Sequence, residues 1–269
     1  MEINLLLRLL IAHLLTDFIL QPKDWVEDKA LKKIKSVKFF MHVTLTAIVA
    51  YLLSGYYMNW YIPIAIFITH YFIDLLKTHL QDNFRNFIID QFLHVLVIFI
   101  ICLTIDNKWG DWLLLLSLQL VKTNFWLIIV AYLFVTWPLG IMIGKGTQKW
   151  RNQIAKEHQK AQLNKLYKTS LEGKIEMAEQ PEELQEEEQG LGLASAGKWI
   201  GICERVLILT FMLMQQYTAF GFLMTAKSIL RFSEKETNTQ LKTEYVLVGT
   251  LVSFTSSAII GVVISYLLM

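Results

Sequence analysis

Charged residues are scarce in this sequence, and cysteine and proline are scarcer still. Of its 269 residues 18% are charged, compared with about 25% in a typical soluble chain, while 54% are hydrophobic. The two cysteines provide neither a disulfide framework nor a metal-binding spacing. A formal net charge of +2 is too small for a surface that binds nucleic acid. These shortages exclude a soluble enzyme, a disulfide-stabilised scaffold, a disordered chain and a nucleic-acid-binding protein.

The sequence is rich instead in long apolar segments. They lie at 4–21, 38–55, 59–80, 87–105, 125–144, 199–231 and 245–268. Most approach the ~20 residues that a helix needs to cross a bilayer. The longest, 199–231, contains Gln215 and Gln216 and is expected to form a tight hairpin, while 111–121 is too short to cross and is expected in the interface. We therefore expect an all-α, polytopic membrane protein with about six to eight transmembrane or membrane-embedded helices.

Charge divides the chain into three expected parts. A membrane helix bundle is expected over 1–144, and a membrane hairpin with a last helix over 198–269. The polar insert between them, 145–197, has a basic first half and an acidic end, which is typical of a solvated segment. Lysines also crowd 22–38, whereas 55–61 has no charged residue. Because basic loops stay on the cytoplasmic side, this asymmetry predicts that 22–38 and the insert face the cytoplasm.

Three of the apolar segments contain a histidine and an aspartate four positions apart. The pairs are His13 with Asp17, His70 with Asp74, and Asp90 with His94. Residues with this spacing share one face of a helix. The order is reversed in the third pair, whose helix runs in the opposite direction. All three aspartates are therefore expected near the cytoplasmic end, with the histidines about 6 Å deeper. His42 is expected at the level of the aspartates.

Such groups are costly in a membrane, at ~2.5–3.5 kcal/mol for an aspartate near the centre of a helix. They are therefore expected to face one another, water or an ion rather than lipid. Imidazole and carboxylate ligands at this density suit a divalent metal such as zinc, manganese or iron. The candidate metal ligands are His13, Asp17, His42, His70, Asp74, Asp90 and His94. The alternative is a structural network in which the histidines bond to the aspartates and hold the helices together.

Other polar residues extend the predicted site. Glu204 and Asp90 are candidate catalytic bases. Four basic residues can hold a phosphate group or, alternatively, anchor helices at the interface: these are Lys77, Arg205, Lys227 and Arg231.

Three stretches, AHLLTDFILQPKDW, THYFIDLLK and IDQFLH, resemble the bacterial membrane family catalogued as domain of unknown function 3307. The late stretch that begins ICERVLILTF is similar to the C-terminal half of that family. The resemblance implies a protein of the bacterial cytoplasmic (inner) membrane and names no activity. The spacing of His70 and Asp74 also resembles that of predicted metal-dependent membrane hydrolases.

Three functions remain open from the sequence. The first is a metal-dependent hydrolase that acts on a lipid-linked phosphoester or similar amphiphile at the cytoplasmic leaflet, with membrane lipids as its partners. The second is an ion- or proton-coupled transporter that uses the same histidines and aspartates. The outer stretches 95–103 and 259–269 hold no charged residue and favour the one-sided pocket of the first. The third is a membrane scaffold that presents 145–190 to a cytoplasmic partner.

Overall fold

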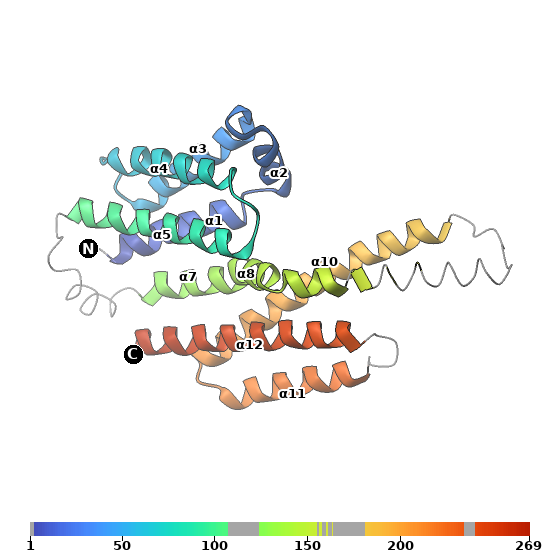
Figure 1. The fold of residues 1–269 in the computed structure, drawn as a ribbon. Helices are drawn as coiled ribbons and strands as arrows, with labels where there is room; N and C mark the ends of the chain where they lie inside the picture. The colour runs from blue at the N-terminus through green and yellow to red at the C-terminus, as the bar shows by residue number, and fades with distance from the viewer. Residues whose placement is uncertain are drawn as a thin grey trace. The chain divides into compact units, whose positions relative to one another are not determined.

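The computed structural model describes residues 3–106, 124–154, 156–157, 160, 163, 181–233 and 240–269. All regular elements in these ranges are helical, as expected from the sequence (Figure 1). The N-terminal elements are α1 (Ile3–Phe18), α2 (Lys23–Lys32), the 3₁₀ turn η1 (Lys33–Lys35), α3 (Val37–Ser54), α4 (Tyr61–Lys77) and α5 (Phe84–Asp106). They are followed by α7 (Asn124–Thr136), α8 (Pro138–Gly146), α10 (Pro181–Leu213), α11 (Tyr217–Ser233) and α12 (Gln240–Leu268).

Four helical stretches in the described part of the chain are long and apolar enough to cross a membrane. They are Val37–Ser54, Phe84–Ile105, Asn124–Gly146 and Leu247–Leu268. The bent pair Ile3–Phe18 and Lys23–Lys35, with an angle of 80° between its parts, would add a fifth. These stretches are those of a membrane protein, but the expected count of six to eight is not confirmed. One reason is length, because α1 and α4 have only 16 and 17 residues. The segment 111–121 lies outside the described residues.

By compactness the chain divides into two units, Met1–Leu139 with Ile260–Met269, and Gly140–Ile259. We describe each by itself. The division into 1–144, 145–197 and 198–269 rests on polarity, which is a different criterion, and stays a prediction.

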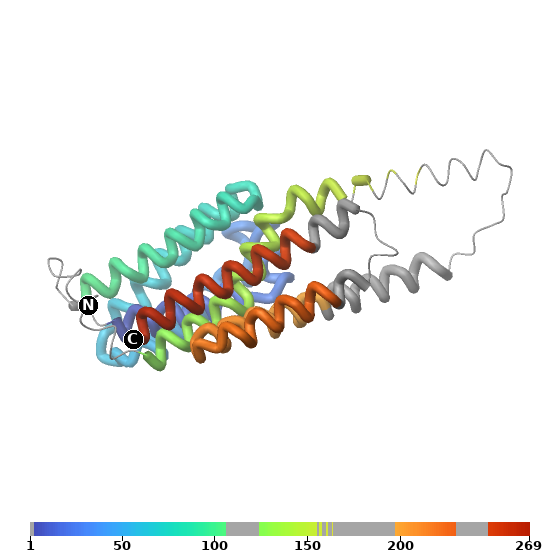
Figure 2. Tube along the Cα trace, turned by 90° about the horizontal axis from the view of Figure 1, so that it is seen from below, coloured from blue at the N-terminus to red at the C-terminus, as the bar shows by residue number. Residues whose placement is uncertain are grey.

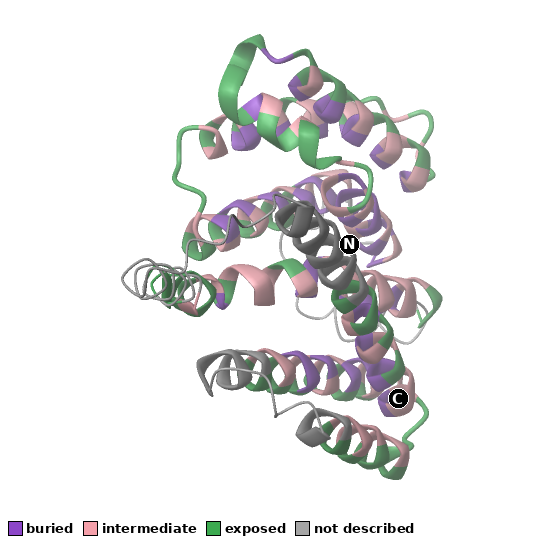
Figure 3. Ribbon diagram, turned by 90° about the vertical axis from the view of Figure 1, so that its right-hand side faces the viewer, coloured by how far each residue is buried: buried purple, intermediate pink, exposed green. Residues whose placement is uncertain are grey.

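Four helices of the first unit form a closed ring. Helix α1 packs against α3 and α5, α3 packs against α4, and α4 packs against α5, while α7 contacts α1. The buried residues of these helices lie on the faces that they turn toward one another (Figure 3). The interior of the ring is apolar toward the start of α1, with Leu5 and Leu9 almost fully buried. One to two helical turns further along α1 the interior becomes polar, at His13, Thr16 and Asp17.

Local chemistry sets both ends of α3. The hydroxyl oxygen of Ser36 accepts a hydrogen bond from the Phe39 N–H, 3.1 Å away, and so caps the first turn. At the other end Gly55 adopts a left-handed conformation, with φ at 76°. Arg8 of α1 donates to the Ser54 carbonyl oxygen 3.4 Å away, and its guanidinium lies over the Trp126 ring of α7. A Cβ on Gly55 would lie 2.7 Å from the Arg8 guanidinium, so this turn requires glycine.

The second unit contains a helical hairpin that breaks at the predicted position. Helix α10 ends at Leu213, Gln215 takes a left-handed φ of 58°, and α11 begins at Tyr217. Helix α11, the orange helix in Figure 2, then packs against α10. Ile208 and Met212 of α10 form the core of this unit with a phenylalanine of α12, Phe254.

Candidate metal centre

The four helices of the ring bring together all seven residues predicted as metal ligands. Helix α1 carries His13 and Asp17, α3 carries His42, α4 carries His70 and Asp74, and α5 carries Asp90 and His94. We call these seven residues the central cluster. Each of their side chains is at most 5% exposed. The i, i+4 spacing noted in the sequence explains how each helix turns both of its members toward the same interior point.

Four atoms at the middle of the central cluster lie close to one another. The Nε2 atoms of His42 and His70 are 3.0 Å apart. Asp17 Oδ1 lies 3.6 Å from each of these nitrogens. Asp74 Oδ2 lies 3.6 Å from His42 Nε2 and 3.9 Å from His70 Nε2. Two carboxylates from two helices therefore lie beside the same pair of imidazole nitrogens.

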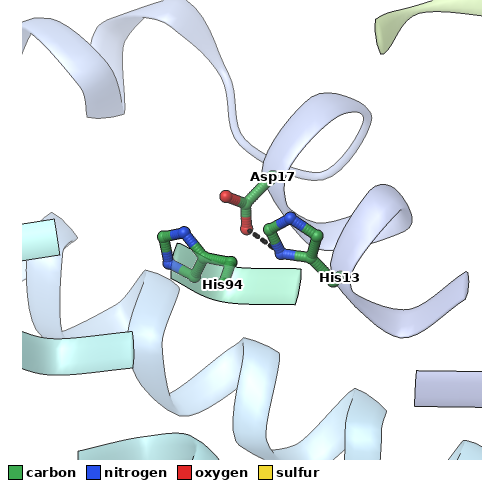
Figure 4. A group of neighbouring side chains, drawn as sticks. All are labelled: His13, Asp17 and His94. Carbon is green, nitrogen blue, oxygen red and sulfur yellow. Dashed lines mark ion pairs between the residues drawn. The ribbon is translucent and has the colours of Figure 1, made fainter. Parts of the chain in front are cut away.

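The remaining members are arranged around this middle. His94 places Nδ1 2.8 Å from the main-chain oxygen of Asp90, and its ring lies 4.4 Å from that of His70. His13 places Nδ1 3.5 Å from Asp17 Oδ1 and Nε2 3.2 Å from the Gln91 side-chain oxygen. Figure 4 shows His13 and Asp17 on one helix and His94 facing them from another. Three overlapping groups have ligand atoms within 4.8 Å of one another and could hold a metal ion: His13–Asp17–His94, Asp17–His42–His70 and His70–Asp74–His94.

One member of the site was missed from the sequence. The 22–38 segment contains α2, and its Lys29 is buried with its ammonium 2.8 Å from Asp74 Oδ2. Asp28 fixes the position of α2, because its carboxylate accepts a hydrogen bond from the Ser36 hydroxyl, 2.5 Å away, at the start of α3. A signal was available, because Lys29 follows Trp25 by four positions and so shares the face of an aromatic residue. The lysines of 22–38 were all assigned to the cytoplasmic side from their number, so the burial of Lys29 was not expected.

Lys77, predicted to bind phosphate, reaches the site from α4. Its ammonium forms an ion pair with Asp90 Oδ2, which also accepts a hydrogen bond from the Gln91 amide nitrogen 3.0 Å away. The Lys77 side chain is 32% exposed, whereas that of Asp90 is 3% exposed. Lys77 therefore links the central cluster to the surface.

The charges of the site are unevenly balanced. Asp74 pairs with Lys29 and Asp90 pairs with Lys77. Within the described residues, no lysine or arginine forms an ion pair with Asp17. Its Oδ1 atom is buried, is surrounded by histidine nitrogens at 3.5–3.6 Å and forms no hydrogen bond. A buried carboxylate oxygen with no lysine or arginine beside it is costly, so this position is suited to a positive charge.

A cavity of about 20 Å³ adjoins the histidines, and none of the aspartates of the central cluster lines it. It is lined by His13, His70 and His94 together with apolar residues and the threonines Thr46 and Thr69. This volume is large enough for one water molecule. The central cluster therefore has room for a small ligand beside the imidazoles.

The other predicted site residues belong to the second unit. Glu204 of α10 forms an ion pair with Lys227 of α11, whose ammonium also lies 4.9 Å from the centre of the Phe254 ring. Arg205 is buried, and a Cβ on Gly140 would lie 2.9 Å from its guanidinium. The side chain of Arg231 lies outside the described side chains. The structure thus pairs two of these residues with each other, and their proposed roles in catalysis or phosphate binding stay predictions.

These features define a helical membrane protein with a buried histidine–aspartate cluster in its N-terminal ring. The model of the family described as "Protein of unknown function (DUF3307)" matches residues 5–136, which contain the whole central cluster. The resemblance to this family that was expected from the sequence is confirmed over these residues. The match does not include the C-terminal stretch, and nothing found supports the likeness to metal-dependent hydrolases. No curated protein and no solved structure matches the chain.

Proposed function

We propose that this protein binds a divalent metal ion in the central cluster and uses it to hydrolyse a phosphoester of a membrane lipid or a similar amphiphile. The observation that carries the proposal is the spacing of four buried atoms, which are Asp17 Oδ1, His42 Nε2, His70 Nε2 and Asp74 Oδ2. The two histidine nitrogens are 3.0 Å apart, and each lies 3.6–3.9 Å from the two carboxylate oxygens. Around a tetrahedral zinc ion with ligand bonds of 2.0–2.1 Å, neighbouring ligand atoms are about 3.3–3.4 Å apart. The separations that involve the two histidine nitrogens are within about half an ångström of this spacing.

Electrostatics supports the same position. With neutral histidines, the three aspartates and two lysines of the site leave one negative charge in excess, and Asp17 is the carboxylate without a lysine. A divalent cation beside Asp17 Oδ1 supplies the missing positive charge and turns four mutually repelling lone pairs into ligands. Zinc, manganese and iron all accept this combination of imidazole and carboxylate ligands.

The residues around this position suit hydrolysis. A bound divalent ion lowers the pKa of water and polarises a phosphoryl oxygen. Asp90 is the candidate base, because its Oδ2 is held by Lys77 and Gln91 while its buried Oδ1 has no hydrogen-bond partner. Lys77, which reaches the surface, is positioned to attract the phosphate of a substrate. Glu204 as an alternative base, and Arg205, Lys227 and Arg231 as groups that hold a phosphate, stay predictions from the sequence for the second unit.

The position of the site favours a substrate in the cytoplasmic leaflet. Asp74 and Lys77 lie in the last turn of α4, and the lysine-rich α2 reaches Asp74 through Lys29. Lysine-rich segments stay in the cytoplasm, which supports a cytoplasmic position for the polar end of the ring in a bacterial inner membrane. An amphiphile can place its headgroup at this level while its chains remain in the bilayer.

The first test is the metal content of the purified protein. Wild type and the variants His70→Ala and His79→Ala are purified in detergent without chelator, and their zinc, manganese and iron are measured by mass spectrometry. His79 is exposed and lies outside the central cluster, so its variant is the matched control. We expect at least one equivalent of metal in wild type and in the control, and loss of metal from His70→Ala.

The second test is release of phosphate from lipid phosphoesters in mixed micelles by the same three proteins, with and without chelator. We expect activity that chelator and His70→Ala both abolish. Wild-type protein that stays metal-free after incubation with each of the three ions contradicts the proposal and favours proton-coupled transport through the same residues. Metal-loaded protein without hydrolysis of any lipid phosphoester contradicts the enzymatic part alone.

A further inference from the structure

We propose that the central cluster holds two metal ions, with Asp17 shared between them, and that His13 and His94 form the second position. This inference rests on the proposed function, in which the first ion binds Asp17, His42, His70 and Asp74. It assigns a separate role to the two histidines that the first position does not use.

The hydrogen bonds of His94 determine which of its nitrogens is free. Nδ1 lies 2.8 Å from the main-chain oxygen of Asp90, and a carbonyl oxygen can only accept. The proton of a neutral ring is therefore on Nδ1, and Nε2 carries a lone pair. This Nε2 is buried and has no hydrogen-bond partner. The ring is 4% exposed and lines the cavity of about 20 Å³, so its lone pair belongs to the interior of the site.

A hydrogen bond to Gln91 determines which nitrogen of His13 is free, and in this ring it is Nδ1. The Gln91 amide nitrogen donates to Asp90 Oδ2, so its side-chain oxygen faces His13 Nε2 at 3.2 Å and accepts the proton of that nitrogen. His13 Nδ1 then carries the lone pair, and it lies 3.5 Å from Asp17 Oδ1. Two acceptors facing each other in a buried site repel unless a cation lies beside both. Many metal-binding histidines are oriented in the same way, by a hydrogen bond from the ring nitrogen that does not bind the metal.

The second position is also supported by its geometry. The rings of His13 and His94 are stacked, with centroids 4.9 Å apart and planes at 18°. Ligand atoms of these two residues and Asp17 lie within 4.8 Å of one another (Figure 4). Asp17 also belongs to the group with His42 and His70, so its carboxylate is common to both positions. In two-metal sites the ions are about 3.5–4 Å apart and together stabilise the attacking and leaving oxygens of a phosphoryl group. Two ions would also give the site the excess positive charge that an anionic phosphoester requires.

The number of bound ions tests this inference. Metal-free protein in detergent is titrated with Mn²⁺, bound metal is counted by mass spectrometry after desalting, and the spin coupling between ions is recorded by electron paramagnetic resonance. We expect two equivalents with the signal of a coupled pair in wild type and in the control His79→Ala. His94→Ala is expected to retain one equivalent with an uncoupled signal. Gln91→Leu preserves every ligand and is expected to weaken the second equivalent 10–100-fold without affecting the first.

The outcomes separate the two proposals. Wild type that binds no metal contradicts the proposed function. Wild type that saturates at one equivalent contradicts the second position and leaves the first intact. Two equivalents that persist unchanged in both His94→Ala and Gln91→Leu contradict the assignment to His13 and His94. If His94→Ala fails to fold, Gln91→Leu alone decides, because it removes the hydrogen bonds of Gln91 to His13 and Asp90 and leaves every proposed ligand in place.

Discussion

The Nε2 atoms of His42 and His70 lie 3.0 Å apart between α3 and α4, although 28 positions separate these residues in the sequence. Two imidazole lone pairs at this distance would repel, so either a proton or a cation lies between the rings. In the first case His42 and His70 form one hydrogen bond of a structural network. In the second they act as two ligands of one ion, and the two cases differ in what their substitution does.

The first prediction concerns this pair. Loss of a residue that hydrogen-bonds to a metal ligand lowers metal affinity by up to about 100-fold. His42→Ala and His70→Ala each remove a proposed ligand and are expected to lower zinc affinity by more than this. The double variant is expected to bind no more weakly than the worse single variant, because loss of either ligand already dismantles the site. Isothermal titration in detergent measures all three affinities. Additive losses in the double variant would indicate that the two histidines act independently.

The second prediction concerns the buried ion pair of Lys29 and Asp74. Lys29→Met keeps the apolar part of the side chain and leaves Asp74 charged and buried, which typically costs about 3–5 kcal/mol. The free energy of unfolding of the metal-free protein is therefore expected to fall by this amount, and added zinc is expected to restore part of it. Lys32→Met is the matched control, because the Lys32 side chain is 61% exposed. Thermal unfolding in detergent follows both, and equal losses would contradict a special role for Lys29.

The third prediction separates Lys77 from Lys29. Because the Lys77 side chain is 32% exposed, water can replace it beside Asp90, and Lys77→Met is expected to destabilise the protein less than Lys29→Met. If Lys77 attracts the substrate, this variant raises KM for a lipid phosphoester, and Lys77→Arg retains much of the wild-type value. Steady-state kinetics in mixed micelles measures both. An unchanged KM would place phosphate binding elsewhere.

The fourth prediction concerns the turn after α3. Gly55→Ala forces a side chain into a left-handed backbone and brings its Cβ to 2.7 Å from the Arg8 guanidinium. We expect a loss of about 1–2 kcal/mol in stability. Gly144→Ala is the control, because it lies in α8 with no atom within 4 Å of an added Cβ, and helix propensity favours the alanine. Differential scanning fluorimetry in detergent compares the two, and a neutral Gly55→Ala would show that the turn can relax.

The site was predictable from the sequence to the extent that it depends on helical periodicity. The i, i+4 spacing of His70 and Asp74 implies one shared face, and the reversed order of Asp90 and His94 implies a common depth. The position of Lys29 was not predictable by counting charges. Its burial depends on the bend between α1 and α2 and on the contact of Asp28 with Ser36, both of which are tertiary.

By itself, the sequence determined an all-helical membrane protein with polar pairs on three of its helices, because hydropathy and side-chain period are local properties. Only the tertiary structure decided which atoms of those pairs meet. In the tertiary structure His42 lies against His70, and Asp74 and Asp90 each form an ion pair with a lysine. Asp17 lies beside imidazole nitrogens instead. The physical reason is that periodicity fixes the face of a helix, whereas its partners depend on how four helices close into a ring and exclude water from the middle.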